Sequence, residues 1–374
     1  MLKIIDLFCG TGGFAHGFVH SGRGFKALYA IDSNKYAVGT ASANHRKLVV
    51  ECRDIRAVEP EEISDRLGKP MVDVIIGGPP CQGFSSLRPN RRTNVNDDRN
   101  NLFLNFARFV DFFRPKVFVF ENVVGLVTHN NGETLERICE TFCSLGYGID
   151  WKILNAASYG VPQKRERFIM IGASDNIRIV FPQPSHFYTG RVIGHKDKDR
   201  LFLPDASLPA ALTVEQAIGD LPELKSSESV GEYDRRPRNE YQRERRNGTS
   251  RLLLHKAANH SEKMLEVIRH AGESISCIPK HLINSGFSSC YSRLAAKEPS
   301  TTITVKFQSP ASSKCIHPYQ DRTITPREAA RIQSFDDDYM FYGPLTHVAS
   351  QLGNAVPPLL GKAIANSVAD MLNA

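Results

Sequence analysis

The sequence predicts an α/β protein in which a mainly parallel sheet carries helices on both faces and a smaller, irregular domain is attached. In the first half of the chain, short apolar runs alternate with longer segments of helical periodicity, as in a doubly wound sheet. Near Pro182 this alternation stops, and a stretch rich in Pro, Gly, Ser and basic residues continues to about Pro318. Because that stretch is too long for one loop, we expect domains over 1–184 and 185–318, with 319–374 returning to the first domain.

The individual elements follow from the same periodicities. Short apolar runs predict strands over 2–7, 27–32, 47–52, 72–78, 115–122, 150–156 and 167–173. Helices are expected between them, over 12–22, 35–45, 101–115 and 132–146. Cys139 and Cys143, in the last of these helices, are expected to pack in the core. After the irregular domain, amphipathic helices are predicted over 324–335 and 357–373.

The composition is that of a soluble protein with room for two domains. The 374 residues are 41% hydrophobic and 23% charged, and no apolar segment approaches the length of a membrane span. The first residues enter a strand pattern at once, which leaves no room for a signal peptide, so a cytoplasmic location is expected. The net charge of +7 and the pI near 8.9 are compatible with a polyanionic partner. The arginine-rich stretch 235–247 is either a solvated surface segment or a phosphate-contacting face.

A glycine-rich turn at 6–14, "DLFCGTGGF", ends the first predicted strand. Gly10, Gly12 and Gly13 would let a ligand approach the backbone at the start of the following helix. Asp32 ends the second strand, at a position where an acidic side chain often accepts hydrogen bonds from ribose hydroxyls. Together these features favour a nucleoside cofactor. The turn departs from the GxGxxG fingerprint of dinucleotide-binding proteins, which makes NAD the weaker choice.

A second candidate site is Cys81 in "GGPPCQGFSS", residues 77–86, where a buried strand is expected to end and a loop to begin. In an open α/β sheet, ligands and catalytic groups collect at that edge. A cysteine thiolate is a strong carbon nucleophile when a base lies nearby or its pKa is lowered; the alternative is an inert packed cysteine. The polar, arginine-bearing stretch that follows, 85–101, has the composition of a flap beside the nucleophile.

Charged residues stand at two further predicted strand ends. Glu121 follows an apolar strand, so burial is expected to raise the pKa of its carboxyl group, which serves either proton chemistry or a structural ion pair. Arg165 and Arg167, in "PQKRERF" at 162–168, alternate along a strand and so project to one face. Two guanidinium groups on one face suit the binding of an anion or of a polar heterocycle, unless the strand is simply solvated.

Six motifs occur in order along the chain: "DLFCGTGGF", "PPCQGFS", "ENV", "QKRER", "RTITPREAARIQSF" and "QLGNAVPP". This series resembles that of the cytosine-C5 DNA methyltransferases, in particular those of bacterial restriction-modification systems. The resemblance runs from the first strand to the last helix and leaves out only the irregular middle, which in that family is the variable target-recognition domain. It implies the Rossmann-like fold of the methyltransferases that use S-adenosylmethionine.

The resemblance implies S-adenosylmethionine as the cofactor, S-adenosylhomocysteine as its product, and no metal. Phe8 and Leu102 would lie against the adenine, Asp32 would bind the ribose, and Gly10 and Gly12 would line the methionine part. The full set implied to bind the cofactor is Phe8, Cys9, Gly10, Thr11, Gly12, Gly13, Asp32, Ser33, Asp54, Ile55, Pro80, Leu102, Asn354, Ala355 and Val356.

For the reaction, the resemblance implies that the Cys81 thiolate adds to C6 of a cytosine, which makes C5 nucleophilic. Glu121 would protonate or hydrogen-bond N3 and the exocyclic amine, and Arg167 would hold O2, with Arg165 and Asn122 supporting the site. The base has to leave the duplex to enter such a pocket. The residues expected to contact double-stranded DNA are Gln82, Ser85, Arg88, Arg91, Arg92, Gln163, Arg235, Arg236, Arg238 and Arg243.

Three alternatives stay open. One branch of the same family methylates transfer RNA, but it carries a Cys-Phe-Thr tripeptide that this sequence lacks, and the long basic middle suits duplex DNA better. An inactive relative that binds DNA would be expected to lack Pro-Cys or Glu-Asn-Val, and both are present. A nicotinamide-dependent oxidoreductase, suggested by the opening turn and Asp32, leaves "PPCQGFS" and "QKRER" unexplained. We therefore expect a DNA (cytosine-5-)-methyltransferase that acts as a monomer on nucleoid DNA, with any cognate restriction endonuclease acting separately.

Overall fold

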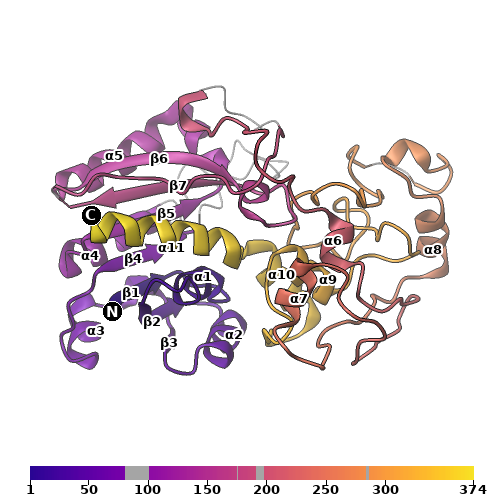
Figure 1. Cartoon of the computed structure of the whole chain (residues 1–374), viewed down its shortest axis with the longest axis horizontal. Coiled ribbons are helices and arrows are strands. Elements are labelled where there is room, and N and C mark those ends of the chain that lie inside the picture. Colours follow the sequence, from indigo (N-terminus) through magenta and orange to yellow (C-terminus); the bar gives the residue numbers. More distant parts are fainter. Residues whose placement is uncertain (81–100, 175, 191–197, 284–285) are drawn as a thin grey trace.

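The computed structural model describes residues 1–80, 101–174, 176–190, 198–283 and 286–374. Figure 1 shows a larger lobe built around the sheet and a smaller lobe that carries α6 to α10, with the last helix, α11, lying back on the larger lobe. Along the described ranges, no helix combines the length and the apolar character that crossing a membrane requires.

The sheet has seven strands in the order β3-β2-β1-β4-β5-β7-β6. Its members are β1 (Leu2–Leu7), β2 (Phe25–Asp32), β3 (Val49–Cys52), β4 (Val74–Gly77), β5 (Val117–Asn122), β6 (Gly148–Asn155) and β7 (Glu166–Ala173). The first five pair in parallel, whereas β7 is antiparallel to its neighbours β5 and β6. The predicted mainly parallel sheet is thus confirmed. The link from β6 to β7 is short, and short links favour antiparallel pairing because a parallel crossover needs more chain.

Helices cover both faces of the sheet, as predicted. One face carries α3 (Pro60–Arg66), α4 (Leu102–Phe113) and α5 (Glu133–Ser144), and the other carries α1 (Gly13–Val19) and α11 (Pro358–Asn373). Ile5 of β1 packs with the first group and Ile4 with the second, because successive side chains of a strand point to opposite faces. Helix α2 (Lys35–Asn44) lies beside β2 and β3, where Ala41 packs against Ala30.

Within α5, the buried residues are Leu135, Ile138 and Phe142. Cys139 is half-buried beside them, but Cys143 is exposed. The expectation that both cysteines pack in the core is therefore wrong for Cys143, which the helical turn carries past the apolar stripe.

The smaller lobe contains short helices and long irregular connections. Its helices are α6 (Val214–Ile218), α7 (Glu240–Arg246), α8 (Glu262–Arg269), α9 (Pro326–Ile332) and α10 (Leu345–Asn354). Helices α9 and α10 share one apolar core with α6 and α7, while α8 packs in a separate cluster that includes Ile278 and Ile316. The segment 319–374 is therefore divided between the lobes. Its last helix, α11, lies on the sheet, and residues before it also bond to the larger lobe, as Tyr339 does to Thr11 and Gln351 to Thr40. The predicted domain bounds stay a prediction.

Helix α9 departs from the predicted amphipathic pattern, because all its residues are buried, charged ones included. Arg331 pairs with Asp220 at 2.9 Å and with Asp337 at 2.5 Å. Arg322, just before the helix, binds Glu328 through two contacts of 2.7 and 2.8 Å. Burial by itself would raise the pKa of Glu328, but the Arg322 guanidinium outweighs burial and lowers that pKa below its usual value. A buried ion-pair network thus takes the place of the exposed polar face.

Breaking this network is expected to cost much of the protein's stability. In Arg331→Met, Asp220 and Asp337 each lose a buried cationic partner, so the free energy of unfolding should fall by about 3–5 kcal/mol. The matched control is Arg243→Met, whose partner Glu240 is exposed; a loss of less than about 1 kcal/mol is expected there. Urea unfolding of the two variants measures the difference, and equal losses would contradict the importance given to the network.

Candidate active site

The carboxyl ends of the parallel strands and the start of β7 meet at one edge of the sheet. Asp32 ends β2, and Glu121 precedes the last residue of β5. Because β7 runs antiparallel to β5, its first residues lie beside the last residues of β5, with Phe168 opposite Asn122. The fold therefore brings Glu121 and the neighbour of Phe168, Arg167, to the same place.

The turn after β1 has the backbone conformation that its glycines predict. Gly10 and Gly12 lie in the left-handed region, with φ of 52° and 80°, and Phe8 does so as well, with φ of 59°. The amide of Cys9 donates a hydrogen bond to the carbonyl oxygen of Ile31 (3.0 Å), which ties the turn to the end of β2. A Cβ on Gly10 would meet no atom within 4 Å, so the turn borders open space.

Asp32 faces this turn. Its Oδ2 accepts a hydrogen bond from the amide of Gly10 (2.9 Å), and its Oδ1 accepts one from the amide of Asn34 (2.8 Å). Burial raises the pKa of Asp32, although these amide donors oppose the shift. The residue is only half-buried, so its other lone pairs can accept hydrogen bonds from the hydroxyl groups of a ribose.

An apolar wall lies next to this acceptor. Phe8, Ile55 and Leu102 pack in one cluster on the α4 face of the sheet. The preceding Asp54 uses its carboxylate to cap the 3₁₀ turn Ile55–Ala57 and to bind Arg56 at 2.6 Å. An apolar wall beside a hydrogen-bond acceptor fits the adenine and the ribose of a nucleoside.

Other predicted cofactor residues have different surroundings. The side chain of Cys9 packs against Ala30 and Ala41, and its main-chain amide and carbonyl group bond to Ile31 and Gly12. Ser33 and Pro80 are exposed. Their contact with a cofactor stays a prediction.

The segment 354–356 lies against the glycine turn. A Cβ on Gly13 would be 2.7 Å from the carbonyl oxygen of Val356 and 2.9 Å from the ring of Phe335, so only glycine allows this approach. Tyr339 holds the turn as well, because its hydroxyl group donates to the carbonyl oxygen of Thr11 (2.6 Å). Two stretches from opposite ends of the chain therefore form one surface.

Glu121 and Arg167 form an ion pair in which Nε lies 2.7 Å from Oε1, and each side chain is 12% exposed. Burial raises the pKa of Glu121; Arg167 and Arg165 lower it, but burial prevails. The carboxyl group therefore holds its proton to a higher pH than an ordinary glutamate. It is suited to donate that proton to a ligand at the sheet edge.

Cys81 lies outside the described residues, as do Gln82, Ser85, Arg88, Arg91 and Arg92. The chain just before Cys81 is held at Glu121. A Cβ on Gly78 would lie 2.7 Å from Oε2 of Glu121, so the chain passes close to the carboxylate and a larger residue would displace it. Nδ2 of Asn122 donates a hydrogen bond to the carbonyl oxygen of Pro79 (3.2 Å). The strand end that carries the acid thus also anchors the chain that leads to the cysteine.

One predicted DNA contact is corrected by the structure, and a second predicted residue lies close to it. Gln163, expected to touch DNA, is fully buried, and both its amide atoms form hydrogen bonds inside the protein. Arg165, expected to support the site, is fully buried, and its guanidinium donates to the carbonyl oxygens of Gly353 and Ala355; its supporting role stays a prediction. Both residues precede β7, in a stretch that the smaller lobe covers.

The basic stretch 235–247 is partly neutralised. Arg235 binds both carboxylate oxygens of Asp234 at 2.9 Å, and Arg243 pairs with Glu240. Arg236 and Arg238 are exposed and form no ion pair with any residue that the structure describes. These two arginines are therefore the better candidates for phosphate contacts.

The local sequence gives little or no signal for several features of the site. The close approach of Gly78 to Glu121 had only the Gly77-Gly78 pair as a signal. Asp6, inside β1, is buried, and burial raises its pKa well above the usual value. Gln333 is fully buried and bonds to Gln163, and nothing in its local sequence distinguishes it from an exposed glutamine.

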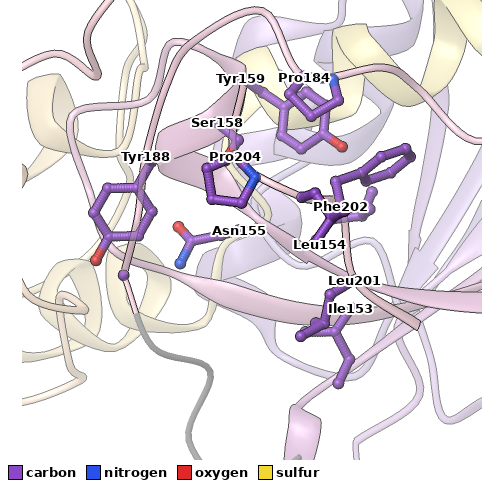
Figure 2. A pocket seen from close by; sticks show the side chains of 12 residues that line it. Ile153, Leu154, Asn155, Ser158, Tyr159, Pro184, Tyr188, Leu201, Phe202 and Pro204 are labelled. Carbon is purple, nitrogen blue, oxygen red and sulfur yellow. The ribbon is translucent and has the colours of Figure 1, made fainter. Parts of the chain in front are cut away.

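A separate cavity of about 240 Å³ opens beside the end of β6 (Figure 2). Tyr159, Tyr188 and Phe202 are among the side chains around it. Among the described residues that line it, none was predicted to act in catalysis or to bind the cofactor. We therefore place the candidate active site at the sheet edge.

Comparison with known families decides between the alternatives for this edge. The family described as C-5 cytosine-specific DNA methylase matches residues 2–370, almost the whole chain. The chain belongs to this family. It is a DNA (cytosine-5-)-methyltransferase.

Relatives of this methyltransferase include enzymes of bacterial restriction-modification systems. Type II methyltransferase M.AgeI of Thalassovita gelatinovora is 35% identical, over 98% of this chain and 99% of its own length. Type II methyltransferase M1.HphI of Haemophilus parahaemolyticus is 37% identical, over 99% of this chain and 87% of its own length. A solved structure from E. coli, of a prophage-encoded protein assigned as a DNA modification methyltransferase, has a TM-score of 0.75 at 26% identity, over the full length of both chains. Family and fold together imply S-adenosylmethionine as the cofactor.

The pKa of Glu121 offers a direct test of the site's electrostatics. Arg167→Met removes the paired cation and leaves the burial, so the pKa of Glu121, already raised, is expected to rise further. Carbon-13 NMR of the labelled carboxyl group measures it. Lys164→Met removes a cation that pairs with Glu298 instead, and it should leave the pKa unchanged.

The raised pKa of Glu121 also determines whether its contribution to stability rises or falls with pH. A raised pKa means that folded Glu121 keeps a proton that the unfolded chain releases, so its contribution to stability declines as pH rises above about 4.3. A lower pKa of Glu121 in Arg167→Met would contradict the electrostatic account.

Proposed function

We propose that this methyltransferase modifies C5 of a cytosine flipped out of duplex DNA, by way of a covalent bond between Cys81 and C6 of the base. The observation that carries the proposal is the Glu121–Arg167 pair at the sheet edge, with the chain leading to Cys81 fastened beside it. Activation of a cytosine ring needs an acid, a cation and a nucleophile; Glu121 and Arg167 supply the first two, and Cys81 would supply the third.

Activation begins with the cysteine. The Sγ thiolate of Cys81 forms a bond to C6, and the electrons of the C5–C6 double bond move toward N3 and O2. Glu121, whose pKa burial raises, donates its proton to N3 as this charge develops. Arg167 stabilises the charge at O2. C5 is then an enamine carbon, which is nucleophilic.

The glycine turn, Asp32 and the apolar wall of Phe8, Ile55 and Leu102 would hold S-adenosylmethionine, which when bound supplies the methyl group as an electrophile on a sulfonium. After transfer, a base removes the proton from C5, the C5–C6 double bond forms again, and the C6–Sγ bond breaks. Cys81 leaves as a thiolate, and Glu121 takes back the proton from N3. The product is 5-methylcytosine, and every residue returns to its starting state.

Duplex DNA is the substrate that the rest of the chain favours. A stacked base cannot reach Glu121 at the sheet edge, so the cytosine must be extruded from the duplex. The net charge of +7 and the exposed Arg236 and Arg238 suit a phosphate backbone. As in the systems of the related enzymes, methylation would protect host DNA from a separate restriction endonuclease. One copy of the chain is sufficient for this chemistry.

Bisulfite sequencing of plasmid DNA from cells that express the protein tests reaction, nucleophile and target together. Protected cytosines within one short sequence are expected for the wild type, and none for Cys81→Ala, because the variant lacks the thiolate that activates C5. The variant should still bind S-adenosylhomocysteine. A fully converted plasmid from soluble, cofactor-binding wild-type protein would overturn the DNA assignment, and transfer RNA would be the next substrate to assay.

Salt dependence tests the DNA contacts of the smaller lobe. If Arg236 and Arg238 each meet a phosphate, the double alanine variant should bind DNA more weakly and reduce the slope of log K against log salt by about 2. Arg243→Ala should have a smaller effect, because Glu240 already neutralises that arginine. An unchanged slope in the double variant would make the stretch an ordinary solvated surface.

A further inference from the structure

Three stretches of chain meet in a buried junction between the lobes. They are 162–165, just before β7; 298–304, from the smaller lobe; and 352–356, which ends α10 and lies on the glycine turn. The first two are joined by main-chain hydrogen bonds, from the amide of Lys164 to Ser300 (2.7 Å) and from the amide of Ser300 to Pro162 (2.9 Å). The third is pressed against the second.

Two buried glutamine side chains carry a directed series of hydrogen bonds across this junction. The amide of Ile303 donates to Oε1 of Gln163 (2.9 Å), and Nε2 of Gln163 donates to Oε1 of Gln333 (3.0 Å). Nε2 of Gln333 then donates to the carbonyl oxygen of Leu352 (2.5 Å). A main-chain donor at one end and a main-chain acceptor at the other set the direction, so neither amide can turn over without losing a bond.

Arg165 spans the same junction. Its Nη2 donates to the carbonyl oxygens of Gly353 and Ala355, at 2.9 Å each, and its Nη1 donates to that of Ile303 at 3.4 Å. The positive charge lies at the carboxyl end of α10, where the helix carbonyl groups carry partial negative charge. A Cβ on Gly353 would lie 2.4 Å from the main-chain nitrogen of Val305, so the end of α10 has no space to shift toward residues 304–305.

We propose that Gln163, Gln333 and Arg165 are positioning residues that couple the position of the smaller lobe to the cofactor segment 354–356. The inference rests on the proposed binding of the cofactor by that segment. A displacement of 298–304 would be passed through these side chains to the end of α10, and from there to Val356, which lies against Gly13 of the glycine turn.

The junction is also connected along the chain to the Glu121–Arg167 pair. The stretch that contains Gln163 and Arg165 continues directly into Arg167, which pairs with Glu121. The same buried contacts therefore help to place both the cofactor segment 354–356 and the Glu121–Arg167 pair. Errors of about 1 Å in the relative placement of reacting groups are enough to slow a reaction substantially.

Binding of S-adenosylhomocysteine, measured by calorimetry without DNA, tests the proposal in Gln333→Met. Methionine keeps the length of the side chain and removes both amide groups, which leaves Gln163 and the carbonyl group of Leu352 without their partner. The Kd should rise about tenfold. In enzyme assays, the KM for S-adenosylmethionine should rise by a similar factor, with a smaller change in kcat.

Gln163→Met should weaken binding to the same degree. The double variant should bind no more weakly than either single variant, because each change breaks the same series of bonds. Additive losses of affinity would show that the two glutamines act separately and would overturn the coupled arrangement.

Gln242→Met is the matched control for lost stability. Gln242 is also a buried glutamine, with Oε1 bonded to the amide of Arg238 (2.7 Å) and Nε2 to the carbonyl oxygen of Glu215 (3.5 Å), but it belongs to α7. Its replacement should lower the melting temperature and leave the Kd within about twofold. If Gln333→Met behaves in the same way, its glutamine is merely structural and the proposal fails.

Arg165→Lys gives an independent result should a glutamine variant not fold. A single ammonium group keeps the charge but cannot reach the three carbonyl groups that the guanidinium binds. Weaker binding of S-adenosylhomocysteine supports the proposal, and an unchanged Kd overturns it.

Failure of the proposed function would be seen separately, because the wild-type protein would then bind S-adenosylhomocysteine but leave cytosine unmethylated.

Discussion

The antiparallel strand β7 is the constraint on which both the candidate active site and the lobe junction depend. It lies between β5 and β6 and begins where β5 ends. This direction places Arg167 against Glu121 and brings the preceding Gln163 and Arg165 to the smaller lobe. A parallel strand in the same place would begin at the opposite edge, away from the carboxyl ends at which ligand sites form. One reversal of chain direction therefore unites the acid, its cation and the attachment of the second lobe.

Buried carboxyl groups have lowered pKa values in the smaller lobe and a raised pKa at Glu121 in the larger lobe. In the network around α9, burial alone would raise the pKa values of Glu328 and Asp337, but paired guanidinium groups outweigh it and lower them. At Glu121, burial outweighs the one paired guanidinium of Arg167, and the pKa rises. The first arrangement makes a permanently ionised scaffold. The second leaves a carboxyl group whose protonation can change during a reaction.

The proposed cofactor pocket depends on the two ends of the chain. The glycine turn follows the first strand, and the segment that lies against it precedes the last helix. Helix α11 packs on the same face of the sheet as α1, so the segment before it is carried to the turn. The proposed coupling through Gln163, Gln333 and Arg165 adds a third participant, since the smaller lobe then shares in placing the segment.

The sequence by itself determined the mainly parallel sheet, the helices on both faces, and the placement of Asp32 and Glu121 at strand ends, because local periodicity and residue type specify these features. The order of the motifs likewise identified the family. Only the tertiary structure decided the direction of β7, the contacts that 319–374 makes with both lobes, and the burial of Gln163 and of the charged residues of α9. A glutamine or an arginine has the same local pattern whether it faces DNA or a buried partner. Contacts between distant residues decide which it does, because a buried polar group is tolerated only where a partner is positioned to meet it.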